Sequence, residues 1–248
     1  MFSIADELKF VIEPQISPFC GPLFFTRSWE SAVGDNVIAN GSFGLVDTGL
    51  KKLLITCHHV WEKFQAERRN DSKVRMCVWL DQKQPVVFGQ QVPIDHDESL
   101  DIATFDITPV LAACGGRKFY PLHQNPAPRV AKGDRLVLKG YPGVARSATV
   151  EGLDFGTTIY ACEVSDVSGL RVMADLSKAA KKFFGPPVRI PEPETSPHGG
   201  ISGSPCFLVR DARPVRLVGF VTADCLDILR FTHASCLNPD GTIKKTAA

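Results

Sequence analysis

Short runs of alternating apolar and polar residues occur along most of the chain, and few stretches have the period of a long helix. In the clearest run, 73–81, every second residue is apolar: Val74, Met76, Val78 and Leu80. Such alternation is typical of strands with one face in a core. Gly, Pro, Asn and Asp separate the runs and favour turns. Many short strands at this spacing predict an all-β protein built as a sandwich or barrel.

A stretch rich in Pro and Gly, 112–131, divides these strands into two halves. We therefore expect an N-terminal β-domain over 36–120 and a C-terminal one over 121–240. Residues 1–35 are expected to form an N-terminal extension and 241–248 a tail.

Two short segments have a helical pattern instead. Val60 to Arg68 follows a pair of histidines, and its Trp61 and Phe64 lie three residues apart among charged side chains, which predicts a brief helix. A helical turn is also expected at 177–182, before an irregular stretch that leads to the serine motif described below.

Composition limits the classes of partner. The chain has 248 residues, of which 44% are hydrophobic and 22% charged, as in a globular protein with a sizeable core. Its 28 basic and 27 acidic residues nearly cancel, so no overall field attracts nucleic acid. No segment approaches the roughly 20 apolar residues that span a bilayer. We expect neither a nucleic-acid nor a membrane partner.

The eight cysteines are scattered, with no CxxC pair and no cluster with histidine at the spacing of a metal site. This spacing favours reduced core thiols over a metal site or a disulfide framework. The N-terminal residues Met1 to Pro14 include three acidic side chains and lack the pattern of a signal peptide. Together these features predict a reducing, cytoplasmic location.

Small residues crowd around one serine between His198 and Pro205. Gly200 lets the backbone turn its N–H toward a reacting carbonyl, and the N–H of Ser202 can point the same way, which together form an oxyanion hole. Glycine and serine beside proline are also typical of an ordinary turn. These residues alone therefore do not distinguish an oxyanion hole from an ordinary turn.

Three motifs follow one another along the chain. They are Thr56-Cys57-His58-His59, Asp101-Ile102-Ala103 and Gly200-Ile201-Ser202-Gly203-Ser204-Pro205. In this order they resemble the trypsin-like, chymotrypsin-fold serine peptidases, especially the bacterial members, and Gly140-Tyr141-Pro142-Gly143 and Leu217 to Val221 resemble that family's second barrel. The resemblance covers about residues 40–235. It implies two packed six-stranded antiparallel β-barrels with the active site between them.

The order histidine, aspartate, serine argues against two other classes of serine hydrolase. α/β-Hydrolases run serine, acid, histidine, and subtilisins run aspartate, histidine, serine. The α/β-hydrolase motif also needs a glycine where this chain has Ser204.

The resemblance implies a role for each motif residue in a serine endopeptidase that acts on proteins or peptides. Ser202 is the nucleophile, His59 the general base and Asp101 the residue that orients the imidazole, while the N–H groups of Gly200 and Ser202 form the oxyanion hole. This chemistry needs no metal and no organic cofactor. By the same resemblance, the substrate pocket is lined by His198, Thr222, Ala223 and Asp224.

Several residues compete for these roles. His58 competes with His59, Ser204 with Ser202, and three nearby carboxylates with Asp101: Asp95, Asp97 and Asp106. The motif spacing favours His59 and Ser202. Cys206 suggests a thiol enzyme of the same fold, but it lies four residues beyond the nucleophile position, which favours a small core residue.

One position departs from the digestive members of the family, which place an aspartate before the nucleophile to pair with a freed N-terminal amine. Here Ile201 cannot form that pair, so we expect no trypsin-style activation by N-terminal cleavage. The resemblance leaves room for an activating partner or additional domains. The alternative functions are a non-catalytic peptide-binding or scaffold module, and an esterase or self-cleaving enzyme on the same fold.

Overall fold

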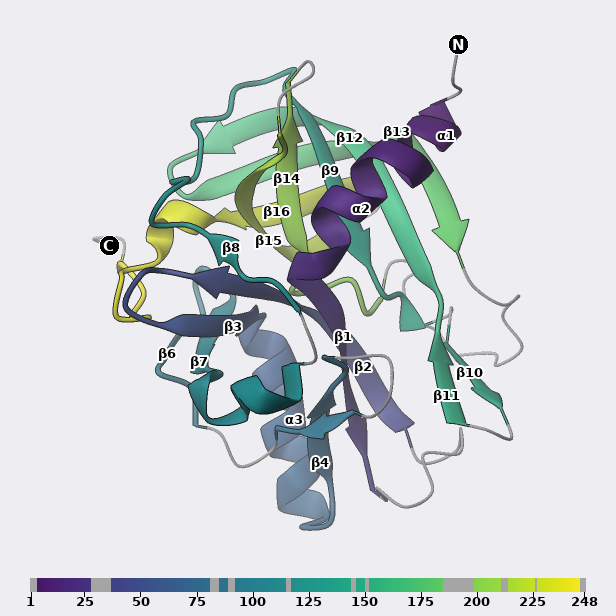
Figure 1. The fold of residues 1–248 in the computed structure, drawn as a ribbon, viewed down its shortest axis with the longest axis vertical. Helices are drawn as coiled ribbons and strands as arrows, with labels where there is room; N and C mark the ends of the chain where they lie inside the picture. The colour runs from purple at the N-terminus through teal and green to yellow at the C-terminus, as the bar shows by residue number, and fades with distance from the viewer. Residues whose placement is uncertain are drawn as a thin grey trace.

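The computed structural model describes residues 4–27, 37–80, 85–88, 92–114, 117–143, 146–149, 152–184, 199–210, 214–225 and 227–245. Most of these residues lie in antiparallel strands, so the all-β prediction is confirmed. The strands form one closed barrel and one further large sheet, which lie one above the other in Figure 1.

The large sheet is built from the first half of the chain. Its seven antiparallel strands run in the order β5-β4-β1-β2-β3-β7-β6, and β8 pairs with β2 in parallel. The strands are β1 (Cys20–Thr26), β2 (Val37–Asp47), β3 (Lys52–Thr56), β4 (Arg75–Val78), β5 (Val86–Val87), β6 (Asp95–Asp97), β7 (Ile102–Asp106) and β8 (Tyr120–Pro121). Residues 20–26, which the sequence placed in an N-terminal extension, thus form an inner strand of this sheet.

The second half closes into the barrel β12-β13-β16-β15-β14-β9. Its strands are β9 (Arg135–Gly140), β12 (Thr157–Ser168), β13 (Arg171–Phe184), β14 (Pro205–Val209), β15 (Arg216–Cys225) and β16 (Ile228–His233). A separate hairpin, β10 (Arg146–Thr149) with β11 (Gly152–Phe155), lies alongside the first sheet (Figure 1), where Phe155 packs against Phe24 of β1 at 5.3 Å between ring centroids.

Two expectations differ from this structure. Only the second half forms a closed six-stranded barrel among the described residues; the end strands of the first sheet, β5 and β6, have two and three residues and offer few backbone groups for closure. The helical turn expected at 177–182 is wrong, because this segment belongs to β13 and pairs with Ile159 to Ala161 of β12. Cross-strand pairing there outweighs the helix preference of its Ala and Lys residues.

The chain begins with a helical segment, 4–19, that crosses the outside of the barrel (Figure 1). It consists of α1 (Ile4–Glu7), the π-type turn η1 (Leu8–Ile12), α2 (Glu13–Ile16) and the 3-10 turn η2 (Ser17–Phe19). Leu8, Ile12 and Ile16 lie four residues apart and are all buried, so one face of the segment packs on the protein. We call residues 4–19 the N-terminal helical segment.

The longest helix, α3 (His58–Asn70), follows β3 directly. The predicted helix is confirmed: Phe64 is buried in the core of the first sheet, Trp61 is partly buried against that core, and Val60 is buried there as well. Two 3-10 turns, η4 (Thr108–Cys114) and η6 (Ala234–Cys236), complete the helical elements that the structure describes. No helix in the described part of the chain is both long and apolar enough to cross a membrane.

Residues 237–245 turn back from the barrel onto the first sheet without forming a helix. The Thr104 hydroxyl donates to the carbonyl of Gly241 at 2.7 Å, and the N–H of Ile243 donates to the Asp95 carboxylate at 2.9 Å. This segment therefore joins the two halves on the side away from the N-terminal helical segment (Figure 1).

Candidate active site

His59 and Asp101 meet where α3 begins. His59 lies in the first turn of this helix, directly after β3, and Asp101 lies in the turn between β6 and β7. The carboxylate accepts two bonds from the same residue, one from the backbone N–H of His59 at 2.9 Å and one at its ring Nδ1 at 2.7 Å. The ring is fixed in orientation, and with Nδ1 engaged, Nε2 is the nitrogen left for chemistry. The His59 side chain is 51% exposed, so a substrate can reach it.

The turn that carries Asp101 is held from both halves of the molecule. Asp101 has a φ of 50°, a left-handed backbone conformation that aspartate tolerates better than most residues. From the barrel, the Thr232 hydroxyl donates to the carbonyl of Leu100, and Arg171 Nη2 donates to the carbonyl of Ser99 at 2.8 Å. The barrel therefore fixes a carboxylate that belongs to the other sheet.

Ser202 lies in a tight turn ahead of β14, shaped by two glycines. Gly200 and Gly203 have φ values of +96° and +90°, which only glycine adopts readily. Ser42 of β2 binds the turn twice, because its N–H donates to the carbonyl of Ser202 and its hydroxyl donates to the carbonyl of Gly200, each at 2.8 Å. Two carbonyls of the turn are thus committed to the first sheet.

The N–H groups of Gly200 and Ser202 remain available. Neither donates a hydrogen bond to any other described residue. Gly200 cannot be replaced without disturbance, because a Cβ there would lie 2.5 Å from the Asn40 side-chain nitrogen and 2.7 Å from the Tyr141 carbonyl oxygen. Two N–H groups without an acceptor among the described residues, beside the half-buried Ser202, are of the kind that an oxyanion hole uses.

Cys57 connects the serine to the aspartate. Its buried thiol donates to the carbonyl of Val221 at 3.0 Å and contacts the side chains of both Ser202 and Asp101. Burial, and then the Asp101 charge, raise the pKa of the thiol well above its ordinary value, while Ser202 opposes the shift. The serine and the carboxylate thus reach the same sulfur atom. No hydrogen bond joins the His59 ring to the Ser202 hydroxyl in the described structure.

Sequence reasoning missed two residues of this arrangement. Cys57 lies inside the histidine motif, and that position was the only signal available for it. Ser42 gave no such signal. Nothing in β2 predicts that its serine binds a turn 158 residues later in the chain.

Donor atoms of Cys57, His59 and Asp101 lie within 4.8 Å of one another, close enough to share a metal ion after adjustment. Burial keeps the thiol protonated, and Nδ1 of His59 already bonds to the carboxylate. Hydrogen bonding therefore accounts for the cluster without a metal.

The competing histidine and serine are buried. His58 stacks on His96 with ring centroids 4.9 Å apart, and its Nε2 lies 3.6 Å from a Glu62 carboxylate oxygen. Ser204 is fully buried, and its hydroxyl has no hydrogen-bond partner among the described residues. Neither side chain can meet a substrate as the exposed His59 can. Cys206 is also buried in the barrel core.

Each competing carboxylate has a structural partner. Asp106 pairs with Lys51 at 2.7 Å, and Asp97 accepts bonds from Ser99 and from the N–H of Leu100. Asp95 binds the segment 237–245, as described above. Only Asp101, among these four, contacts a histidine ring that is open to solvent.

The expected pocket residues are described in part. Thr222 is buried in β15, where its hydroxyl donates to the carbonyl of Arg230 at 3.3 Å, and Ala223 is half-buried next to it. The β15 backbone reaches Asp224, but its side chain lies outside the described residues, as does all of His198. β15 passes the site at Val221, so Thr222 and Ala223 lie near it.

Comparison of the sequence with family models and with curated proteins found no match.

Proposed function

We propose that the protein is a trypsin-like serine endopeptidase that uses Ser202, His59 and Asp101. The observation that carries the proposal is the pair of hydrogen bonds that the Asp101 carboxylate forms with His59, one with the backbone N–H and one with ring Nδ1. This arrangement fixes one tautomer and stabilises the imidazolium that forms during acyl transfer. The exposed ring and the two free N–H groups of the serine turn support the same reaction.

In the proposed reaction, Ser202 Oγ adds to the carbonyl carbon of a peptide bond while its proton passes to Nε2 of His59. The N–H groups of Gly200 and Ser202 bind the oxygen that gains negative charge, at about 3 kcal/mol for each donor. The imidazolium then protonates the leaving amine, the C–N bond breaks, and an acyl-enzyme remains. Water, deprotonated by the same ring, hydrolyses the ester and restores the serine.

Ile201, directly before the serine, supports a turn that needs no N-terminal processing. It is buried in the barrel core and packs so closely on β9 that a Cβ at Gly140 would lie 2.6 Å from it. Apolar packing at this position replaces the charged pair that orders the oxyanion hole of the digestive peptidases.

A second candidate is a non-catalytic peptide-binding module that keeps the same fold. The missing hydrogen bond between His59 and Ser202 favours it. Catalytic hydrogen bonds often tighten only when substrate is bound, so this observation leaves the enzyme as the better supported candidate.

Cleavage of an unfolded protein separates the two. Fluorescein-labelled casein is incubated with the wild type, with Ser202→Ala and with Ser204→Ala, which removes a hydroxyl two residues away. We expect the wild type and Ser204→Ala to release labelled peptides at equal rates. For Ser202→Ala we expect the rate of release to fall at least about 10⁴-fold. Equal cleavage by Ser202→Ala would refute the role of this serine. Saturable binding of casein by all three proteins without cleavage would support the binding module.

A further inference from the structure

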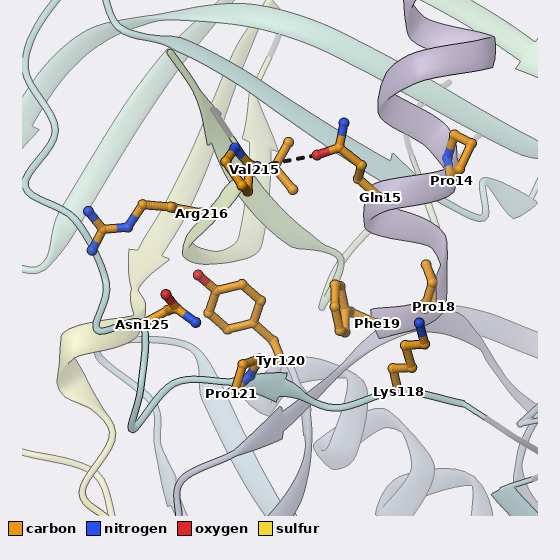
Figure 2. Close-up of a pocket in the computed structure, with 11 residues that line it drawn as sticks. Pro14, Gln15, Pro18, Phe19, Lys118, Tyr120, Pro121, Asn125, Val215 and Arg216 are labelled. Atoms are coloured by element: carbon orange, nitrogen blue, oxygen red, sulfur yellow. Dashed lines mark hydrogen bonds between the residues drawn. The ribbon is translucent and has the colours of Figure 1, made fainter. Parts of the chain in front are cut away.

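A cavity of about 530 Å³ lies between the N-terminal helical segment, β8 and the start of β15, and it is lined by residues other than those of the candidate active site. Figure 2 shows that Phe19 and Tyr120 lie in its middle, with Lys118 on one side of the two rings and Arg216 on the other. Its volume falls within the range of small-molecule sites in proteins.

The aromatic part of this cavity is rigid. The Phe19 and Tyr120 rings meet edge to face with centroids 5.6 Å apart, and each also contacts Phe207 of β14, at 6.1 and 6.0 Å. Four prolines contribute to the walls. A surface that is already ordered loses little conformational entropy when an apolar group binds.

The charged side chains around the rings have one sign. Lys118 and Arg216 line the cavity, and none of the eleven lining residues is acidic. The Lys118 amine forms no ion pair with a described residue. Arg216 Nη2 is anchored to the carbonyl of Pro126 at 2.6 Å, and this guanidinium also contacts the Tyr120 hydroxyl. The Arg216 guanidinium is therefore held in place, and neither cation forms an ion pair with a described residue.

Two uncharged amides line the cavity: Asn125 lies beside the Tyr120 ring (Figure 2), and the Gln15 amide is already occupied. Gln15 Nε2 donates to the carbonyl of Val11 at 2.8 Å, and its Oε1 accepts from the N–H of Val215 at 3.4 Å (Figure 2). Apart from the Asn125 amide, the side chains of the cavity that can recognise an anion are the two cations.

We propose that this cavity binds a small organic anion, an aromatic or other compact apolar group that carries a carboxylate. The apolar part lies against Phe19 and Tyr120, and the carboxylate pairs with Arg216 or Lys118. The proposal does not depend on the proposed function, because no residue of the candidate active site takes part.

Three probes with the same ring and different charge test the proposal: indole-3-acetate, the neutral indole-3-acetamide and the cationic tryptamine. Isothermal titration of the full chain measures each one. We expect saturable 1:1 binding of indole-3-acetate, and at least about tenfold weaker binding of the other two, since a charge-assisted pair contributes about that factor.

Variants locate the site. Lys118→Met and Arg216→Gln are each expected to weaken indole-3-acetate binding about tenfold, while Lys132→Met, which removes an exposed lysine elsewhere, leaves it unchanged. Circular dichroism confirms that each variant is folded. The proposal is overturned if indole-3-acetate shows no saturable binding at millimolar concentration, if the three probes bind equally, or if Lys132→Met has the same effect as the cavity variants.

Discussion

The ion pair between Glu13 and Lys139 fixes the N-terminal helical segment to the barrel. Lys139 Nζ lies 2.6 Å from Glu13 Oε1 and 2.8 Å from the Ser17 hydroxyl, and the two charged side chains are only 10% and 31% exposed. Lys139 is followed in β9 by Gly140, which packs against Ile201 of the serine turn. Breaking this pair therefore tests how much the N-terminal helical segment stabilises the barrel strand that packs on the serine turn.

Glu13→Gln leaves the Lys139 ammonium in its buried position without a carboxylate. Breaking a fully buried pair costs about 3–5 kcal/mol, and breaking an exposed one costs about 1 kcal/mol or less. Because Glu13 is partly exposed, we expect a loss of about 2–3 kcal/mol in the free energy of unfolding. Glu7→Gln is the matched control, since Glu7 pairs with Arg135 of the same strand at 3.5 Å and both side chains are more than a third exposed. It is expected to cost less than about 1 kcal/mol.

The stability that Glu13→Gln removes depends on pH. Burial acts to raise the pKa of Glu13, but the hydrogen bonds from Lys139 and Ser17 outweigh it and leave the pKa below its ordinary value. A carboxyl with a lowered pKa in the folded state stabilises the protein fully above its unfolded pKa, and this contribution is lost as the pH falls through the folded pKa. The stability difference between wild type and Glu13→Gln is therefore largest at neutral pH and shrinks in acid.

Urea denaturation followed by far-UV circular dichroism measures these differences. The double variant Glu13→Gln/Lys139→Met is expected to recover most of the lost stability, because it leaves no buried charge unpaired. The reasoning is refuted if Glu13→Gln is as stable as the wild type at neutral pH, or if Glu7→Gln costs as much.

Four further predictions concern the site. Gly133→Ala and Gly200→Ala both place alanine at a positive φ, +89° and +96°, but a Cβ at 133 has no neighbour within 4 Å, whereas one at 200 lies 2.5 Å from a side-chain nitrogen. Urea denaturation should show that Gly133→Ala lowers the free energy of unfolding by about 1 kcal/mol. Gly200→Ala should lower it by more than about 2 kcal/mol and also abolish casein cleavage. Asp101→Asn should lower kcat for the casein substrate about 10⁴-fold, and a loss below tenfold would contradict its orienting role. Ser204→Ala removes a buried hydroxyl that has no hydrogen-bond partner among the described residues and should raise the free energy of unfolding by about 1 kcal/mol; a loss of stability would mean that the hydroxyl has a partner. The Cys57 thiol, whose pKa is raised by burial, should resist iodoacetamide in the folded protein and react after denaturation, as peptide mass spectrometry can measure.

The strands were predictable because their alternation is a local property. At 73–81 the alternating residues Val74, Met76, Val78 and Leu80 are all buried. The sequence assigned residues 1–35 only to an N-terminal extension, although Leu8, Ile12 and Ile16 have the spacing of one helix face. Pro14 and Pro18, which argue against a long regular helix, fall near the junctions where the segment changes from the π-type turn to α2 and from α2 to the 3-10 turn η2.

The site was predictable only as far as its motifs extend. The spacing within Thr56-Cys57-His58-His59 selected His59, and the structure places that ring beside Asp101, whereas His58 is buried. The contacts of Cys57 and Ser42 depend on how β3 and β2 meet the serine turn from the other half of the chain. Such contacts arise from tertiary packing and have no local signature. The catalytic roles themselves stay predictions.

Covalent labelling of Ser202 tests the central claim most directly. A fluorophosphonate probe is incubated with the native wild type, with heat-denatured protein, and with the variants Ser202→Ala and His59→Ala, and the modified peptide is identified by mass spectrometry. The account predicts one adduct, on Ser202, that forms only in the native wild type. No adduct in the native wild type, an adduct on another serine, or equal labelling of His59→Ala would contradict it.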